Sequence, residues 1–184
     1  MNEVELIEDF EINPLTIAVL PIEYGGKLYS KAYQLDDELI SPFKPLELIR
    51  KCCRLYGSSY EGRKDGSKYL IGITHKIPIT IDSTNLMYFF PTTSPNKPQC
   101  AWISHEHIKD YKKMDSTHTL VSFRNNKSIV IPVSTYSFEN QMLRTALLRT
   151  KLMQNVGDYN RKTMFLYNNH SNASEHITVY GGND

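Results

Sequence analysis

Two histidines separated by one residue offer the first candidate chemistry in this sequence. His105 and His107 lie at the end of an expected strand that begins at Gln99. Alternate residues of a strand point to the same face, so the two imidazoles could share a metal ion, with His75 or Cys100 as a third ligand. No H-E-x-x-H, P-loop or G-x-S-x-G motif accompanies them. A metal-dependent enzyme therefore stays open as an alternative, while a structural or DNA-facing role for the histidines is favoured.

The three cysteines form neither a disulfide framework nor a metal motif. Cys52 and Cys53 are adjacent, Cys100 is remote, and no C-x-x-C spacing occurs. A helical wheel places Cys53 on a buried side, where thiols are usually inert. This usage indicates a reducing compartment, so we expect a cytoplasmic, non-enzymatic protein without a cofactor.

The stronger chemistry is cationic and begins at Lys44. We expect a helix over Leu46–Tyr56, with Pro45 at its first position, followed by a flexible loop over Gly57–Lys64. The polar residues of the helix share an arc of about 100°, which makes one narrow basic stripe. A solvated helix face beside an ordinary turn remains the alternative interpretation. The candidate DNA-binding residues are Arg50, Lys51, Arg54, Arg63, Lys64, Lys68, Lys76, Arg124 and Lys127.

The net charge of +1 hides a strong asymmetry along the 184 residues. Residues 1–43 contain nine acidic and two basic residues, whereas residues 44–76 contain eight basic and three acidic residues. Such a distribution indicates a localised basic patch on a globular protein. It also allows an acidic segment of one copy to pair with the basic segment of another, so we expect a dimer or larger assembly.

Periodicity predicts an α+β fold, with a mainly antiparallel sheet, two packed helices and a flexible C-terminal tail. The second helix covers Ser137–Val156, with Ser137 as its N-cap and Gly157 just past its end. Asn125 and Asn126 form the turn of a hairpin with a cationic tip. The expected strands are Leu15–Ile22, Lys27–Tyr33, Lys68–Thr74, Ile77–Ile81, Leu86–Phe90, Gln99–His105, His118–Phe123 and Ser128–Val133.

The expected domain boundary lies near Gly157. We expect residues 1–157 to form the folded domain that carries the candidate DNA-binding residues, and residues 158–184 to form the flexible tail. Phe165, Leu166 and Tyr167 are the concentrated apolar group of this tail, and they constitute either a docking segment or a last strand of the domain. No signal peptide and no apolar run of membrane-spanning length is present, so no membrane partner is expected.

Ordered sequence blocks through most of the chain carry a resemblance to a known family. They are TIAVLP at 16–21, KPL at 44–46, CR at 53–54, GSSY at 57–60, GRK at 62–64, HK at 75–76, FPT at 90–92, PQC at 98–100, WISH at 102–105, SFENQ at 137–141, RTA at 144–146 and LRTK at 148–151. On these blocks the chain resembles the ComK family of competence transcription factors, which switch on DNA-uptake genes in Gram-positive bacteria.

The resemblance implies a transcriptional activator that binds paired AT-rich promoter boxes through the minor groove and assembles as dimers. It implies a cytoplasmic, nucleoid-associated protein, with RNA polymerase as a conceivable further partner. It also implies capture by an adaptor that delivers the factor to a Clp protease, in which Phe165, Leu166 and Tyr167 match the family's hydrophobic segment. The family then continues with Pro and a cation, whereas this chain has Asn168 and Asn169.

The sequence also suggests a division of labour among the cations. No helix-turn-helix, zinc finger or basic zipper is recognisable, so minor-groove reading by a loop and a hairpin tip is expected. Arg63 in the loop and Arg124 in the tip would then set specificity, whereas Arg50 and Lys51 on the rigid helix would hold phosphates.

Overall fold

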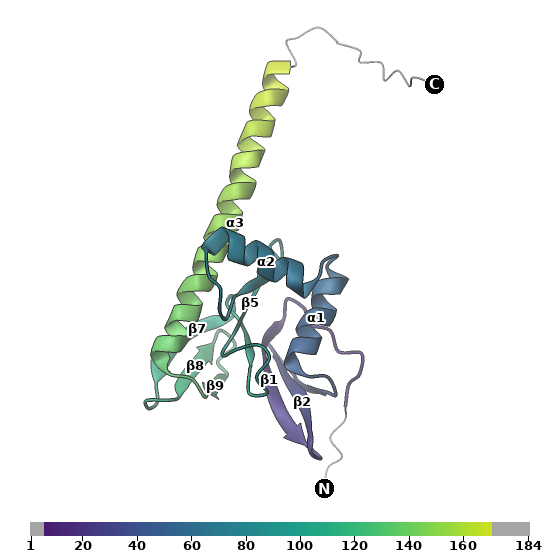
Figure 1. Cartoon of the computed structure of the whole chain (residues 1–184), viewed down its shortest axis with the longest axis vertical. Coiled ribbons are helices and arrows are strands. Elements are labelled where there is room, and N and C mark those ends of the chain that lie inside the picture. The colour runs from purple at the N-terminus through teal and green to yellow at the C-terminus, as the bar shows by residue number, and fades with distance from the viewer. Residues whose placement is uncertain (1–5, 171–184) are drawn as a thin grey trace, which may run out of the picture. The chain divides into compact units, whose positions relative to one another are not determined.

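The computed structural model describes residues 6–170 of the chain. The chain divides into two units between Lys151 and Leu152, and the last helix contributes to both. The elements are β1 (Thr16–Tyr24), β2 (Lys27–Gln34), β3 (Glu38–Ser41), α1 (Pro45–Leu55), α2 (Tyr60–Ile71), β4 (Ile79–Asp82), β5 (Met87–Pro91), β6 (Trp102–Ser104), β7 (Ile108–Lys113), β8 (Thr119–Phe123), β9 (Ser128–Ile131) and α3 (Thr135–His170), as labelled in part in Figure 1.

Two antiparallel sheets form the framework of the first unit. The larger has the strand order β3-β2-β1-β6-β5-β4, and the smaller has the order β7-β8-β9. Strand β1 joins the two halves of the larger sheet, because Ala18 pairs with Ile103 and Val19 pairs with Trp102. The expected α+β class and antiparallel pairing are confirmed, but residues 6–170 contain three helices rather than the expected two.

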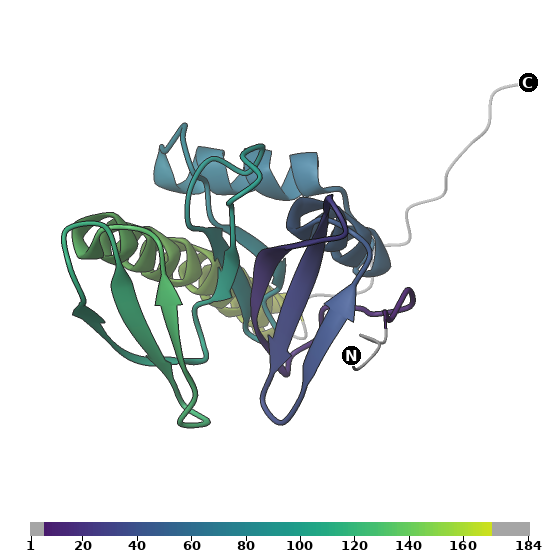
Figure 2. The same ribbon diagram turned by 90° about the horizontal axis from the view of Figure 1, so that it is seen from below.

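Both faces of the larger sheet are buried, and side-chain alternation assigns each residue to one face. Val19, Phe89 and Trp102 pack on the side of α1 and the start of α2. Their neighbours in sequence, including Ala18 and Phe90, pack on the opposite side with the smaller sheet and the start of α3. The first unit is therefore layered, with the helices α1 and α2 on one face and the smaller sheet on the other (Figure 2).

Helix α1 forms as the sequence predicts. Pro45 occupies its first turn, the backbone N–H of Lys44 donates to Glu47 Oε2 (2.8 Å), and Gly57 follows the helix end with φ of 70°. Cys52 and Cys53 are buried in the core, where burial raises the pKa of the first thiol to about 12 and of the second to about 11. Their expected inertness as nucleophiles follows, because almost no thiolate exists near neutral pH.

Helix α2 occupies most of the segment in which the sequence predicted a flexible loop (Gly57–Lys64) and a strand (Lys68–Thr74), so both predictions were wrong. The hydroxyl of Ser59 accepts the N–H of Gly62 (2.9 Å), which caps the N-terminus, and Gly72 ends the helix with φ of 68°. Only Tyr60 and Ser67 of this helix are fully buried, and Gly62 and Gly66 weaken its apolar pattern. These features explain why periodicity did not reveal it.

Helix α3 begins earlier and ends later than predicted. Its N-cap is Ser134 rather than Ser137, because the Ser134 hydroxyl accepts the N–H of Ser137 (3.3 Å). Gly157 lies inside the helix, so residues 158–170 are helical and not a flexible tail. The rest of the expected tail, residues 171–184, lies outside the described residues. No helix among residues 6–170 is long and apolar enough to cross a membrane.

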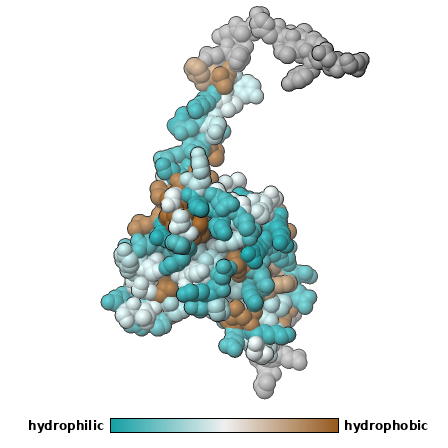
Figure 3. All heavy atoms as spheres, viewed as in Figure 1, coloured by the Kyte–Doolittle hydropathy of each residue, from teal (hydrophilic) through white to brown (hydrophobic). Residues whose placement is uncertain are grey.

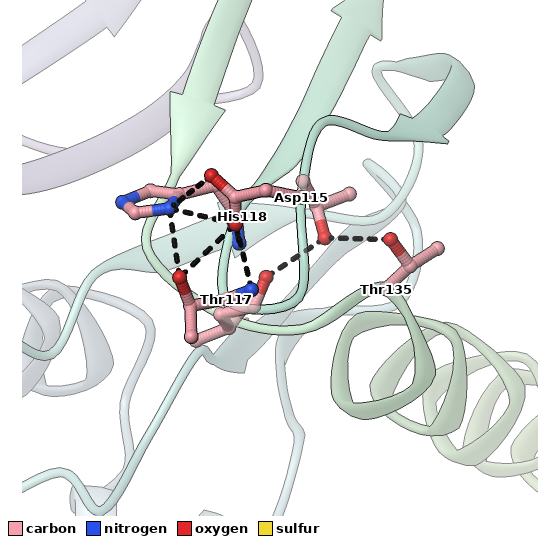
Figure 4. A network of polar contacts seen from close by, with 6 residues as sticks. Asp115, Thr117, His118 and Thr135 are labelled. Atoms are coloured by element: carbon pink, nitrogen blue, oxygen red, sulfur yellow. Dashed lines mark hydrogen bonds and ion pairs between the residues drawn. The ribbon is translucent and has the colours of Figure 1, made fainter.

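The turn between β7 and β8 is held by a carboxylate (Figure 4). Asp115 accepts the N–H groups of Thr117 (2.7 Å) and His118 (2.8 Å) and contacts the His118 ring (3.0 Å). These bonds, led by the Thr117 N–H, lower the pKa of Asp115 to about 2. Nearby, the hydroxyl of Thr119 in β8 donates to that of Thr135 at the start of α3 (3.2 Å). This bond fixes the smaller sheet to the helix.

Candidate nucleic-acid interface

The expected basic stripe exists on α1. Arg50, Lys51 and Arg54 share one side of the helix and, with Glu47 and Phe43, line a hollow of about 420 Å³. The opposite side of the helix is buried through Leu48, Ile49 and the two cysteines. Burial of that side holds the helix backbone on the sheet, so the three cationic side chains leave the protein from fixed points on one side of the helix.

A second hollow connects α1 to α2 and brings together cations that are distant in the sequence. Arg50, Lys64, His75 and Lys76 line it, and its volume is about 240 Å³. Arg50 thus contributes to both hollows, and the Arg50 guanidinium lies 5.7 Å from the ring centroid of Tyr60. The face over α1 and α2 is mainly hydrophilic in Figure 3.

The acidic residues on this surface do not prevent a polyanion from binding to it. Glu61 pairs with Arg50 at 3.3 Å, and both side chains are exposed. An exposed pair of this kind contributes roughly 0–1 kcal/mol and is screened by salt, so a phosphate can replace the carboxylate. The side chains of Arg54 and Lys68 have no hydrogen-bond or ion-pair partner within residues 6–170 and are available to a polyanion.

Two of the predicted cations near α1 and α2, Arg63 and Lys76, make hydrogen bonds within the protein. Arg63 lies on α2, not in a flexible loop, and its Nη2 donates to the carbonyl of Tyr56 at the end of α1 (3.2 Å). Lys76 donates from Nζ to the hydroxyl of Ser137 in α3 (3.0 Å) and has φ of 49°. Both side chains therefore connect secondary-structure elements to one another. From the sequence alone we expected both to be free to contact DNA.

The hairpin tip between β8 and β9 forms as predicted, but it contacts the turn between β2 and β3 (Figure 2). Asn125 donates to the carbonyl of Leu35 (2.7 Å), and Lys127 lies 3.9 Å from Glu38. Arg124 donates from Nε to the carbonyl of Glu106 (2.8 Å). The tip is therefore anchored beside an acidic turn, and Arg124 and Lys127 belong to a different surface from the cations of α1.

The two candidate metal ligands, His105 and His107, follow β6 and have different surroundings. His107 Nε2 lies 2.8 Å from the carbonyl of Pro14. His105 is largely buried, and its Nδ1 has no hydrogen-bond partner within the described part of the chain. Burial lowers the pKa of His105, and the nearby Arg149 and Arg124 lower it further against an opposing effect of Glu106. No group of three or more His, Cys, Asp or Glu among residues 6–170 is arranged to hold a metal ion.

Two features of this surface were missed in the sequence. Phe43 lies beside the stripe on α1, and Lys97 lines a further hollow of about 390 Å³ with Lys44 and Arg50. Lys97 comes from a loop far along the chain, so no local pattern could have placed it there. Phe43 adjoins the predicted helix, and its position between two prolines, Pro42 and Pro45, is the one available signal.

The short connection between α1 and α2 also differs from expectation. Tyr56–Ser59 joins two helices, a connection length that is typical of a helix-turn-helix, and Figure 1 shows α2 crossing the end of α1. The sequence analysis recognised no such unit because it read the second helix as a loop. Lys64 and Lys68 are consequently carried on a helix that follows directly after the basic stripe.

Comparison with known proteins agrees with this arrangement. A model of the ComK protein family matches residues 7–157. A competence transcription factor of Bacillus subtilis (strain 168) is 45% identical over 150 residues, which are 82% of this chain and 78% of the relative. No solved structure matches the chain significantly. The matched region contains every element from β1 to the first part of α3, and it contains all the cations described above. The chain therefore belongs to the ComK family.

Proposed function

We propose that this protein is a sequence-specific DNA-binding activator of competence genes and not an enzyme. The B. subtilis relative is named as a competence transcription factor, and the family match includes the complete cationic surface. The observation that carries the proposal is the rigid presentation of Arg50, Lys51 and Arg54 beside Lys64 and Lys68. Cations spaced along helices that are anchored to the core suit the phosphates of a duplex, which supply most of the affinity and fix the register.

The proposed target is a pair of AT-rich promoter boxes, read through the minor groove. A narrow A-tract groove concentrates negative potential, which favours inserted cations. The helix pair α1 and α2 also makes major-groove reading by α2 a specific alternative. Replacement of A·T by I·C pairs separates the two modes, because it keeps the minor-groove pattern and changes the major-groove pattern.

The decisive experiment is a mobility shift with box-containing and scrambled duplexes at several salt concentrations. We expect tighter binding to the boxes, retention of binding to I·C boxes, and a linear loss of affinity with the logarithm of salt. Arg50→Ala or Lys51→Ala should weaken both duplexes and flatten the salt slope by about one unit for each lost phosphate contact. Lys112→Ala, an exposed cation on β7, is the control. Equal binding of both duplexes by the wild-type protein would refute the proposal.

Three further partners complete the proposal: a second copy of the chain, an adaptor of a Clp protease and RNA polymerase. A paired site is read by two copies of the chain, so light scattering and shift stoichiometry should give a dimer or larger per full site. Phe165, Leu166 and Tyr167 form the docking segment for an adaptor of a Clp protease, and the protein acts in the cytoplasm on the nucleoid with RNA polymerase as a further partner. The three side chains are 66%, 55% and 72% exposed, which leaves them accessible.

A further inference from the structure

An exposed phenylalanine lies within the cationic surface. The Phe43 side chain is 39% exposed and lines the hollow that Arg50, Lys51 and Arg54 complete. The Nζ of Lys51 lies 5.8 Å from the centroid of the Phe43 ring. An aromatic ring surrounded by cations is the combination with which proteins hold unstacked bases next to their phosphates.

The backbone of Phe43 is fixed before any ligand arrives. The hydroxyl of the buried Ser30 donates to the Phe43 carbonyl (2.7 Å). Pro42 precedes the residue and Pro45 follows it at the start of α1, and each proline ring restricts its own φ. Little conformational entropy is then lost when the ring enters a binding partner, which is the advantage of a preorganised contact.

The hollow around Phe43 favours a nucleic acid over a protein as the occupant. Its walls carry Arg50, Lys51 and Arg54 against the single acid Glu47, and Glu61 is already paired with Arg50. A polyanion that also offers an apolar face matches this combination, and a base step between two phosphates has both properties.

We infer that Phe43 is an apolar wedge that inserts at a base step within the AT-rich box, while Arg50 and Lys51 hold the flanking phosphates. Pyrimidine–purine steps such as TA unstack most easily, so a wedge that enters from the minor groove selects sequence through deformability without a base-specific hydrogen bond. The inference rests on the proposed function and names the residue that turns general affinity for DNA into a preference for AT-rich sites.

The test places 2-aminopurine, which becomes brighter when unstacked, at successive TA steps of a box-containing duplex. Wild-type protein should raise the emission at one step. Phe43→Ala should abolish that rise and reduce the ratio of box to scrambled affinity about tenfold, the scale of one lost stacking contact. Phe43→Leu keeps an apolar wedge and should keep most of both effects. The matched control is Tyr136→Ala, which removes an aromatic that is 77% exposed at the start of α3, outside the hollow.

A second variant covers the case in which Phe43→Ala does not fold. Trp102 is the one tryptophan of the chain and is buried in the core, so Phe43→Trp adds an emission that reports position 43. Box duplex should quench this emission and protect it from iodide. Unchanged emission, or a folded Phe43→Ala variant with the wild-type affinity ratio and 2-aminopurine signal, would overturn the wedge and leave DNA binding intact. Absence of any box preference in the wild-type protein would instead overturn the proposed function and the wedge with it.

Discussion

The guanidinium of Arg63 is used by the polypeptide itself. Its Nη2 donates to the carbonyl of Tyr56, and its Nε is buried without a hydrogen-bond partner among residues 6–170. We therefore expect Arg63→Ala to lower the free energy of unfolding by about 1.5–3 kcal/mol, the scale of a hydrogen bond that involves a charged group. The affinity ratio between box and scrambled duplex should not change, in contrast to the expectation from a flexible loop.

Denaturant unfolding and mobility shifts on the same variants check this expectation. Lys64→Ala is the matched control on the next residue of α2, and it should leave stability nearly unchanged while weakening both duplexes. An Arg63→Ala variant with wild-type stability and a reduced affinity ratio would restore Arg63 as a recognition residue.

His105 makes stability depend on pH. Its pKa in the folded protein is lowered mainly by burial and also by Arg149 and Arg124, with Glu106 opposing. The neutral ring is favoured in the folded state, so this stability is complete above the unfolded pKa of about 6.5 and is lost as the pH falls through the folded pKa. Denaturation midpoints between pH 7.5 and 5 should therefore fall less in His105→Asn than in the wild-type protein. His75→Asn, which removes an exposed histidine, should show the wild-type dependence.

At the level of single residues, the sequence was informative where a pattern is local. The stripe of Arg50, Lys51 and Arg54 follows from helical periodicity and is present on α1. Phe43 and Lys97 reach the same surface because the tertiary fold brings the segments before α1 and before β6 beside α1. Spacing within a short stretch of sequence contains no information about such contacts. The partners of Arg63 and Lys127 could not be predicted for the same reason.

Secondary-structure elements were predictable where caps and periodicity agreed. The hairpins β1–β2 and β8–β9 formed at the expected turns, where Gly25, Gly26 and Asn126 have positive φ. Strand β7 was missed because its sequence, IKDYKK, alternates poorly and is mostly exposed. Helix α2 was missed although Ser59 and Gly72 are ordinary caps, since a run of β-branched residues followed and only two of its side chains are fully buried.

The buried side-chain amide of Gln141 connects α3 to the larger sheet. Gln141 donates from Nε2 to the carbonyls of Lys76 (2.9 Å) and Pro91 (2.7 Å). Gln141→Leu would remove both bonds and leave the two carbonyls without these donors, so we expect a loss of about 2 kcal/mol in the free energy of unfolding. Gln154→Leu in the same helix replaces an exposed side chain and should change stability by only a few tenths of that amount. Equal stabilities of the two variants in urea would contradict this role.

For the whole molecule, the segment at the end of α3 should control lifetime in the cell. Phe165, Leu166 and Tyr167 are exposed, and hydrophobic atoms gather near the last described turn in Figure 3. Successive residues of a helix point about 100° apart, so a partner must surround this turn or unwind it to contact all three. Triple replacement by Ala keeps the helix, because Ala has the highest helix propensity, and should lengthen the half-life several-fold after translation is stopped.

DNA affinity and circular dichroism of the triple variant are its controls, and both should match the wild-type protein. Replacement of Leu143, another exposed apolar residue of α3, by Ala should leave the half-life unchanged. A triple variant that is degraded at the wild-type rate would contradict the proposed docking role of this segment.

The pairing of β1 with β6 affects the order in which parts of the protein fold during synthesis. Ala18 and Val19 pair with Ile103 and Trp102, which are synthesised more than 80 residues later. Trp102 also belongs to the same hydrophobic core as Leu48 and Cys52 of α1. Contacts this distant in the sequence slow folding, because a long loop must close before they form. During synthesis, the basic stripe on α1 emerges well before the strand that completes its apolar support. A nascent chain that ends before residue 100 would therefore carry the charges that we propose bind phosphates, without the completed core that holds α1 in place.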